Sequence, residues 1–314
     1  MSSRSWTLLA ILAALWGASY LFIKVALEDL SPAMIVFVRT ALAGAILLPF
    51  AARSGALAGI RERAGWVVLL AGIQVAVPFM LITVGEEEIS SSLAGILVSS
   101  APIFTAILAV WVDHSERSRG WNLVGVVIGI VGVALLLGVD VGGDGAQLLG
   151  AGMVLLASLG YAIGGFMLKR KFAGVQPIGT VTSTMVVSAA MLLPWAAFTF
   201  PSSFPDLEGT ASILTLGIAG TGIAFVIFYT LIATEGPAKA SIVAYVAPIF
   251  AVFYGATLLD EAVTAGTFAG MALILFGSWL AAEGSLRRSR EPVPAMPDTG
   301  GCPDEEPAPS RAAA

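Results

Sequence analysis

Long apolar stretches separated by short polar segments make up most of this sequence. Ten of them have about 20 residues each, the length that an α-helix needs to cross the ~30 Å hydrocarbon core of a bilayer. The predicted spans are residues 5–25, 32–52, 65–85, 91–112, 120–138, 147–168, 177–200, 210–232, 239–259 and 265–283. The alternation over ~10 residues that marks a membrane β-barrel is missing. The pattern therefore predicts an all-α integral membrane protein with ten transmembrane helices.

Composition supports a bilayer environment. The chain of 314 residues is 57% hydrophobic and 12% charged, with a mean hydropathy of +0.91, whereas soluble domains carry roughly 25% charged residues. The 35 glycines favour closely packed helices. The first apolar run has no convincing cleavage motif, so we interpret it as the first span rather than a signal peptide.

The charges are distributed unevenly between the two sides of the predicted bundle. With a cytoplasmic N-terminus, 14 of the 16 basic residues fall on the inner side: Arg4, Arg53, Arg61, Arg63, Arg117, Arg119, Lys169, Arg170, Lys171, Lys239, Arg287, Arg288, Arg290 and Arg311. This bias predicts cytoplasmic N and C termini in a multi-pass protein of the cytoplasmic (inner) membrane. The acidic run of residues 86–88 falls at an outer helix end. No carboxylate lies within a predicted hydrocarbon core, which weakens a proton relay based on a mid-membrane acid.

The sequence contains an internal repeat. LLPFAA at 47–52 recurs as LLPWAA at 192–197, an offset of 145, and APIF at 101–104 recurs at 247–250, an offset of 146. The predicted units are residues 5–138 and 147–283, followed by a polar tail, 285–314, that we expect to be disordered. Because each unit has five helices, the second must enter the membrane from the opposite side, which predicts two inverted five-helix repeats.

Inverted repeats are typical of alternating-access transporters, whose substrate site lies near the bilayer midplane where corresponding helices are interrupted. Pro102 and Pro248 are the expected interruptions and hinges. Each lies roughly 15 Å along its predicted helix, and each removes a backbone donor. Tolerated kinks are the alternative reading of the two prolines.

Several stretches resemble one known family. They are LWGASYLFIKVAL in the first predicted helix, LSPAMIVFVRTALAGAILL in the second, SSSLAGILVSSAPIFTAILAVWVDHSER through the fourth and AKASIVAYVAPIFAVFYGATLLDE through the ninth. With these, the chain is similar to the EamA-like family of the drug/metabolite transporter superfamily, as two copies of the EamA-like domain. The resemblance implies a ten-helix transporter. Members export amino acids and other metabolites, and relatives carry nucleotide sugars and sugar phosphates, so no single cargo is implied.

Polar and aromatic residues in the predicted spans are the candidates for substrate binding. Arg39 lies about eight residues, or ~12 Å, into the second helix, where a charge must face the bundle interior. It either binds a substrate carboxylate or phosphate or braces helix breaks. Gln74, in the third helix, either bonds another helix or faces a cavity, and Lys24 is expected to be an interfacial anchor. The remaining candidates are aromatic: Trp16, Tyr20, Phe79, Tyr161, Phe225, Tyr229 and Tyr245.

Together these features predict a secondary transporter that exports small metabolites such as amino acids. Import, a sugar-phosphate or nucleotide-sugar cargo, lipid flipping and a non-transporting scaffold are the alternatives. An enzyme is disfavoured because the chain has one histidine, His114, and one cysteine, Cys302, both outside the spans. We therefore expect no catalytic residues, metal site or cofactor. The expected partners are a small-molecule metabolite and membrane lipids, not nucleic acid, and a homodimer is left open.

Overall fold

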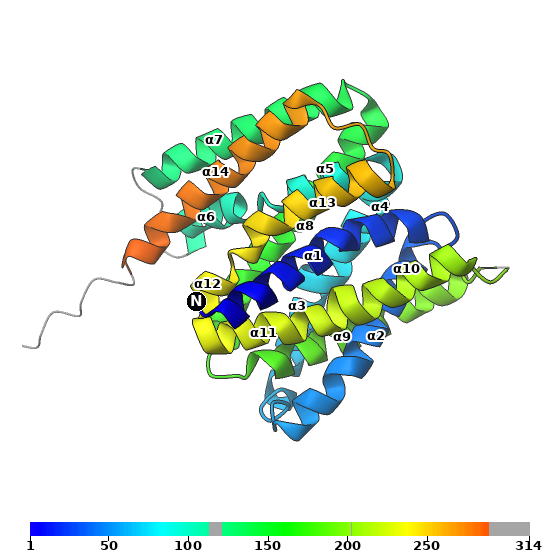
Figure 1. Ribbon diagram of the computed structural model, residues 1–314. Helices are drawn as coiled ribbons and strands as arrows, with labels where there is room; N and C mark the ends of the chain where they lie inside the picture. Colours follow the sequence, from blue (N-terminus) through cyan, green and yellow to red (C-terminus); the bar gives the residue numbers. More distant parts are fainter. Residues whose placement is uncertain (113–120, 202, 289–314) are drawn as a thin grey trace, which may run out of the picture.

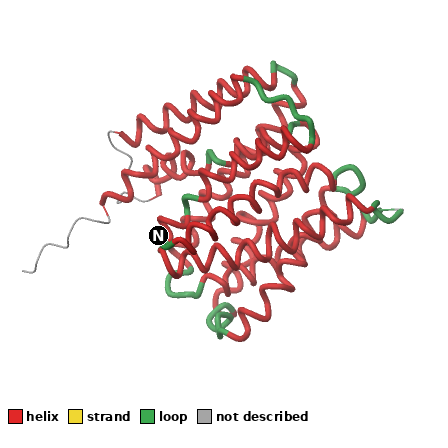
Figure 2. The backbone as a smooth tube through the Cα atoms, viewed as in Figure 1, coloured by secondary structure: helices red, strands yellow, loops and turns green. Residues whose placement is uncertain are grey.

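The fold is a bundle of membrane-spanning helices. The computed structural model describes residues 1–112, 121–201 and 203–288, and within these ranges every regular element is a helix (Figures 1 and 2). In this part of the chain, nine helical segments are long and apolar enough to cross a membrane, and Val243–Leu258 is a shorter apolar helix. The prediction of an all-α membrane protein with ten spans is confirmed.

Five of the ten spans are composite. In chain order the helices are α1 (Ser3–Ala26), α2 (Pro32–Arg53), α3 (Ala64–Ala71), α4 (Val77–Glu88), α5 (Ser91–Val98), α6 (Ala101–Val112), α7 (Trp121–Leu136), α8 (Gly145–Lys171), α9 (Pro177–Phe198), α10 (Leu207–Gly217), α11 (Ala224–Glu235), α12 (Pro237–Ala240), α13 (Val243–Leu258) and α14 (Ala265–Arg288). A 3₁₀ turn, η1 (Arg61–Arg63), precedes α3, and the π-helical segments are η2 (Gly72–Ala76), η4 (Leu137–Val141) and η5 (Ile218–Ile223). The third span is α3–η2–α4, the fourth α5–α6, the fifth α7–η4, the eighth α10–η5–α11 and the ninth α12–α13.

Short polar side chains fix where several helices begin. The Ser31 hydroxyl accepts a hydrogen bond from the Met34 amide at 3.3 Å, and Pro32 follows as the first helical residue of α2. At the start of α10, the Asp206 carboxylate accepts from the Gly209 amide at 2.7 Å. Such N-caps satisfy backbone donors that the first helical turn leaves free.

The internal repeat is visible in the helices. The π-helical segments η2 and η5 lie in the third and eighth spans, and their first residues, Gly72 and Ile218, are 146 positions apart, the offset of the APIF repeat. Equivalent helices of the two halves pack together, α2 on α9 and α7 on α14. In Figure 1, α7 and α14 run side by side at one edge, and α1 lies between α13 and the α10–α11 pair. The inversion of one half relative to the other stays a prediction.

Glycines bring α7 and α14 into close contact. A Cβ on Gly277 would lie 2.5 Å from the Gly129 nitrogen and 2.6 Å from the Gly125 oxygen, so no side chain fits at this crossing. The Asn122 amide nitrogen also donates to the Ala281 oxygen at 3.0 Å. Small residues permit such backbone approach, which is how membrane helices gain packing energy without a hydrophobic driving force.

The two predicted helix interruptions have different outcomes. The fourth span breaks at Ser99 and Ser100, directly before Pro102, which is the second residue of α6. The prediction that Pro248 interrupts its helix is wrong: the ninth span breaks earlier, between α12 and α13, and Pro248 lies inside the continuous α13. A proline inside a membrane helix is tolerated when neighbouring groups and local adjustments satisfy the freed backbone. The hinge role of both prolines stays a prediction.

Hydroxyl groups satisfy the carbonyls that the break in the fourth span exposes. The Ser158 hydroxyl of α8 donates to the Leu97 oxygen at 3.3 Å, and the Ser278 hydroxyl of α14 donates to the Ser99 oxygen at 2.9 Å. All four residues are buried. The break is thus held by protein groups from two other helices.

One helix end differs from the prediction, and some residues named from the sequence lie outside the described part. Helix α14 continues to Arg288, over the first four residues of the predicted tail, and residues 289–314, including Cys302, lie outside the described part. His114 and Glu116, between α6 and α7, also lie outside it.

Candidate functional site

The central candidate is Arg39, on the interior side of α2. It lies seven residues after the first residue of α2, which is about 10 Å along the helix axis, and its residue is 8% exposed. Its Nε donates to the Thr221 hydroxyl at 2.8 Å, and its guanidinium carbon lies 3.9 Å from the centre of the Phe79 ring. Among the described residues, this is its only hydrogen bond and it has no ion pair. The two terminal nitrogens of the guanidinium therefore remain available to an anionic group.

The π-helical segment η5 positions the partner of Arg39. Thr221 is fully buried, and its hydroxyl donates to the Leu216 oxygen, five residues earlier, at 2.9 Å. A π-bulge widens a helix locally and is frequent at functional sites. The equivalent segment η2 has a similar contact at its start, because the Ser188 hydroxyl of α9 donates to the oxygen of Ala71, the residue before η2, at 3.2 Å. Both bulges thus meet a polar side chain from the second helix of the other half.

Four aromatic rings form one wall near this centre. The Trp16 ring centre lies 6.0 Å from that of Phe225 and 5.1 Å from that of Phe228, while Tyr229 lies 6.2 Å from Phe225 and 5.8 Å from Phe228. Distances of this size are typical of favourable aromatic pairs. Three of these residues were predicted from the sequence, and Phe228 was missed.

The arginine and the aromatic wall are linked through one apolar cluster. Phe79 belongs to a group of buried residues on α2, η2, α4 and α9, and Phe225 and Tyr161 both pack against that group. Six predicted residues therefore meet in one interior region: Arg39, Phe79, Phe225, Tyr161 and, through Phe225, Trp16 and Tyr229. Thr221 and Phe228 complete the region.

Other predicted site residues serve contacts between helices. The Tyr20 ring lies against α5, where a Cβ on Gly95 would be 3.2 Å from it. The Tyr245 hydroxyl donates to the Ser278 oxygen of α14 at 3.5 Å. Gln74, half-buried within η2, packs against α8, where a Cβ on Gly164 would be 2.8 Å from its side chain. These observations leave the binding roles of all three as predictions.

The surroundings of Lys24 and Glu86 come from the packing of neighbouring helices. The Lys24 ammonium donates to the backbone oxygens of Glu86 and, at 3.0 Å, of Ile89, at the end of α4. Glu86 lies near the end of α4, as the sequence predicted, but its side chain is 0% exposed. The reason is tertiary: α5 follows α4 after a two-residue turn, and α1 covers the junction.

Replacing Lys24 with methionine tests this contact. The variant keeps the length of the side chain but loses two charge-assisted hydrogen bonds, so we expect it to lower the stability of the purified protein by about 1.5–3 kcal/mol. Lys239→Met is the matched control, because Lys239 is exposed and its partner among the described residues is Glu235, one turn away on the chain, at 3.1 Å. Equal melting temperatures for the two variants in detergent would contradict the role of Lys24.

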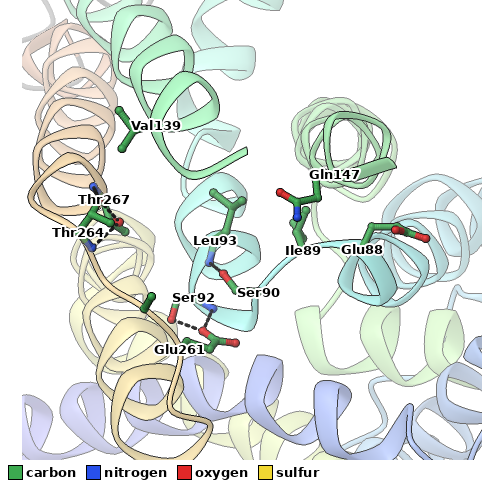
Figure 3. Close-up of a pocket in the computed structure, with 11 residues that line it drawn as sticks. Glu88, Ile89, Ser90, Ser92, Leu93, Val139, Gln147, Glu261, Thr264 and Thr267 are labelled. Atoms are coloured by element: carbon green, nitrogen blue, oxygen red, sulfur yellow. Dashed lines mark hydrogen bonds between the residues drawn. The ribbon is translucent and has the colours of Figure 1, made fainter. Parts of the chain in front are cut away.

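A separate pocket of about 310 Å³ opens where the ends of η4, α5, α8 and α14 meet (Figure 3). Its lining carries Glu88, Ser90, Gln147, Glu261 and Thr264 among other residues, and none of the nine predicted substrate-binding residues. The Glu261 carboxylate accepts from the amides of Ser91 and Ser92, at 2.7 and 3.0 Å, and from the Ser92 hydroxyl. It thereby caps α5 and ties the segment after α13 to the first half of the chain.

The described residues offer no cluster of side chains suited to a metal ion. In the described ranges, no group of three or more His, Cys, Asp or Glu side chains could hold a metal ion. The chemistry that the Arg39 region offers is binding: one charged fork, one hydroxyl and several aromatic faces.

Comparison with known proteins identifies the family. The sequence profile of the EamA-like transporter family matches the chain twice, over residues 4–138 and 148–282. The chain belongs to this family. The resemblance predicted from the sequence, with two EamA-like domains, is therefore confirmed, and the family indicates a transporter rather than an enzyme.

Full-length relatives of this EamA-like transporter are named as transporters. An uncharacterized transporter of Archaeoglobus fulgidus is 27% identical over 88% of this chain and 98% of the relative. The uncharacterized inner membrane transporter YedA of Escherichia coli K12 is 28% identical over 89% and 90%. A probable amino-acid metabolite efflux pump of the same strain is 25% identical over 89% and 95%. The chain is thus a multi-pass membrane protein of the transporter class.

One solved crystal structure has the same fold. It superposes with a TM-score of 0.65, covers 93% of this chain and 100% of its own, and is 19% identical in sequence.

Proposed function

We propose that this protein exports small amphiphilic metabolites that carry a carboxylate, such as amino acids, by alternating access. Arg39 carries the proposal. Its guanidinium is buried within the bundle, has no acidic partner among the described residues, and keeps two nitrogens free for a planar anion. Arg binds carboxylates in bidentate geometry, and a buried charge without an ion-pair partner is costly unless a ligand completes it.

The aromatic wall supports an amphiphilic cargo. Trp16, Phe225, Phe228 and Tyr229 provide apolar faces and two polar groups, the indole N–H and the tyrosine hydroxyl, close to the Arg39 region. Ligand sites typically combine such a lining with a few placed polar groups. Of the relatives, the probable amino-acid metabolite efflux pump has a name consistent with this cargo.

The charge at the site argues against a sugar phosphate or nucleotide sugar. A phosphorylated cargo favours several basic residues, whereas Arg39 is the basic residue of this region and Lys24 binds the backbone of α4. For orientation we propose cytoplasmic N and C termini on the basic-residue bias, and for mechanism a rocking of the two halves about the Arg39 region.

Comparison of culture media tests the proposal. Small molecules are quantified outside cells that overproduce the protein, cells that lack it, and cells that make Arg39→Ala at matched membrane levels. We expect carboxylate-bearing metabolites to accumulate outside only with the unchanged protein. Faster loss of a compound from the medium of the overproducing cells would indicate import instead, and an equal composition in all three media would contradict export.

A further inference from the structure

One glutamate of α4 has a buried carboxyl group that no described residue pairs with. Glu86 is 0% exposed, whereas its neighbours Glu87 and Glu88 are exposed. Neither carboxyl oxygen of Glu86 has a hydrogen-bond partner in the part of the chain that the structure describes. Buried carboxylates are normally ion-paired, hydrogen-bonded or bound to a metal. Glu86 has none of these among the described groups.

Glu86 lies on the face of α4 that reaches the Arg39 region. Phe79, which stacks on Arg39, is seven residues earlier, so the two side chains are two helical turns, about 10 Å, apart on one face. Thr83 lies between them on this face, is fully buried and also lacks a partner for its hydroxyl among the described residues. The interior surface of α4 therefore runs from the candidate substrate site to Glu86.

The charged groups around Glu86 are engaged elsewhere. The groups whose charges act on its carboxyl are Lys24 of α1, Arg39 of α2 and Glu261 beyond α13. Two tyrosine hydroxyls belong to the same network: Tyr20 of α1 and Tyr161 of α8. Lys24 donates to backbone oxygens, Arg39 to Thr221, and Glu261 accepts from α5. None of them forms an ion pair or a hydrogen bond with the Glu86 carboxyl.

We propose that Glu86 is a proton-binding site that couples transport to a proton gradient. A proton needs no shell of several oxygen ligands, unlike a metal cation, and it removes the charge that burial makes unfavourable. In the arrangement seen here, the carboxyl carries the proton and Lys24 holds the end of α4. When α4 moves so that water reaches Glu86, the carboxyl loses its proton to water, and Lys24 releases the backbone oxygens and neutralises the nearby carboxylate.

The proton is neither produced nor consumed in this cycle: it binds from one side of the membrane and leaves on the other. For the proposed exporter, uptake from the outer side and release to the cytoplasm would drive cargo outwards. Only this direction rests on the proposed function, since proton binding by Glu86 is measurable without any cargo.

Infrared spectroscopy of the purified full chain in liposomes tests proton binding. We expect the carbonyl band of a protonated carboxylic acid at neutral pH, with a loss of intensity equal to one acid per chain in Glu86→Gln and no loss in Glu87→Gln. Identical bands in the unchanged protein and Glu86→Gln would overturn the proposal, as would a band that responds to sodium ions and not to pH. If Glu86→Gln does not fold, Glu86→Asp replaces it, because it moves the band without removing the acid.

The coupling role is tested by the pH profile of transport, with the cargo that the culture-medium comparison identifies. We expect Glu86→Asp to displace the profile in the same direction as it displaces the infrared titration, and Glu87→Asp to leave it in place. A displaced titration with an unchanged transport profile would overturn the coupling role. If no cargo is found, the infrared result still decides whether Glu86 binds a proton.

Discussion

Arg39→Ala lowers export of the cargo by at least about tenfold at matched membrane levels. The variant removes the guanidinium whose two terminal nitrogens are free to bind a carboxylate. A hydrogen bond to a charged group contributes about 1.5–3 kcal/mol, and about 1.4 kcal/mol corresponds to a factor of ten. Arg39→Lys is expected to retain part of the activity, because it keeps the charge but not the planar fork. Initial export rates in cells with equal amounts of each variant measure the effect.

Thr221→Val separates the two roles that Arg39 can have. If Arg39 braces the helices, its bond to Thr221 is the essential contact, and Thr221→Val should reduce export as strongly as Arg39→Ala. If Arg39 binds the cargo, Thr221→Val should cost much less, because the free nitrogens of the guanidinium remain. Equal losses in the two variants would refute a ligand role for Arg39.

Gly277→Ala destabilises the protein by about 1–3 kcal/mol, the usual cost of overpacking a tight interface. The new methyl group would lie 2.5 and 2.6 Å from backbone atoms of α7, which cannot rotate away as a side chain can. The two helices must therefore move apart and lose their close packing. Thermal unfolding of the purified protein in detergent provides the measurement.

Gly152→Ala is the matched control for this substitution. Gly152 is an exposed helical glycine of α8 with no atom within 4 Å of its Cβ position, so alanine should be neutral or slightly stabilising there. A melting temperature of Gly277→Ala equal to that of Gly152→Ala would show that the α7–α14 crossing is looser than described.

The helices and the repeat could be predicted from the sequence because the bilayer imposes a simple rule. Every backbone polar group in hydrocarbon must be paired within a helix, so each span needs a long apolar run. The same rule explains why the interior position of Arg39 could be predicted, since a charge within such a run must face the interior. Phe79 and Phe225, related by the repeat offset, pack against one cluster next to it.

The partners of these residues could not be predicted, because they depend on tertiary packing. Thr221, which accepts the hydrogen bond from Arg39, lies in the π-helical segment η5, and its one signal in the sequence was a polar residue between two glycines in an apolar helix. Glu86 is buried by the tight α4–α5 turn, which hydropathy cannot locate. Pro248 shows that the repeat can also mislead: it predicted a helix break at this residue, yet α13 continues through the proline.

Purified protein in liposomes shows directly whether Arg39 is needed to move carboxylates. The vesicles are loaded with a labelled mixture of amino acids, other carboxylates and neutral solutes, and release is followed for the unchanged protein, Arg39→Ala and empty vesicles. If Arg39 binds the cargo, the unchanged protein releases carboxylate-bearing solutes, and Arg39→Ala loses this release while it remains folded. Equal release of these solutes by both proteins, or release of neutral solutes only, would contradict it.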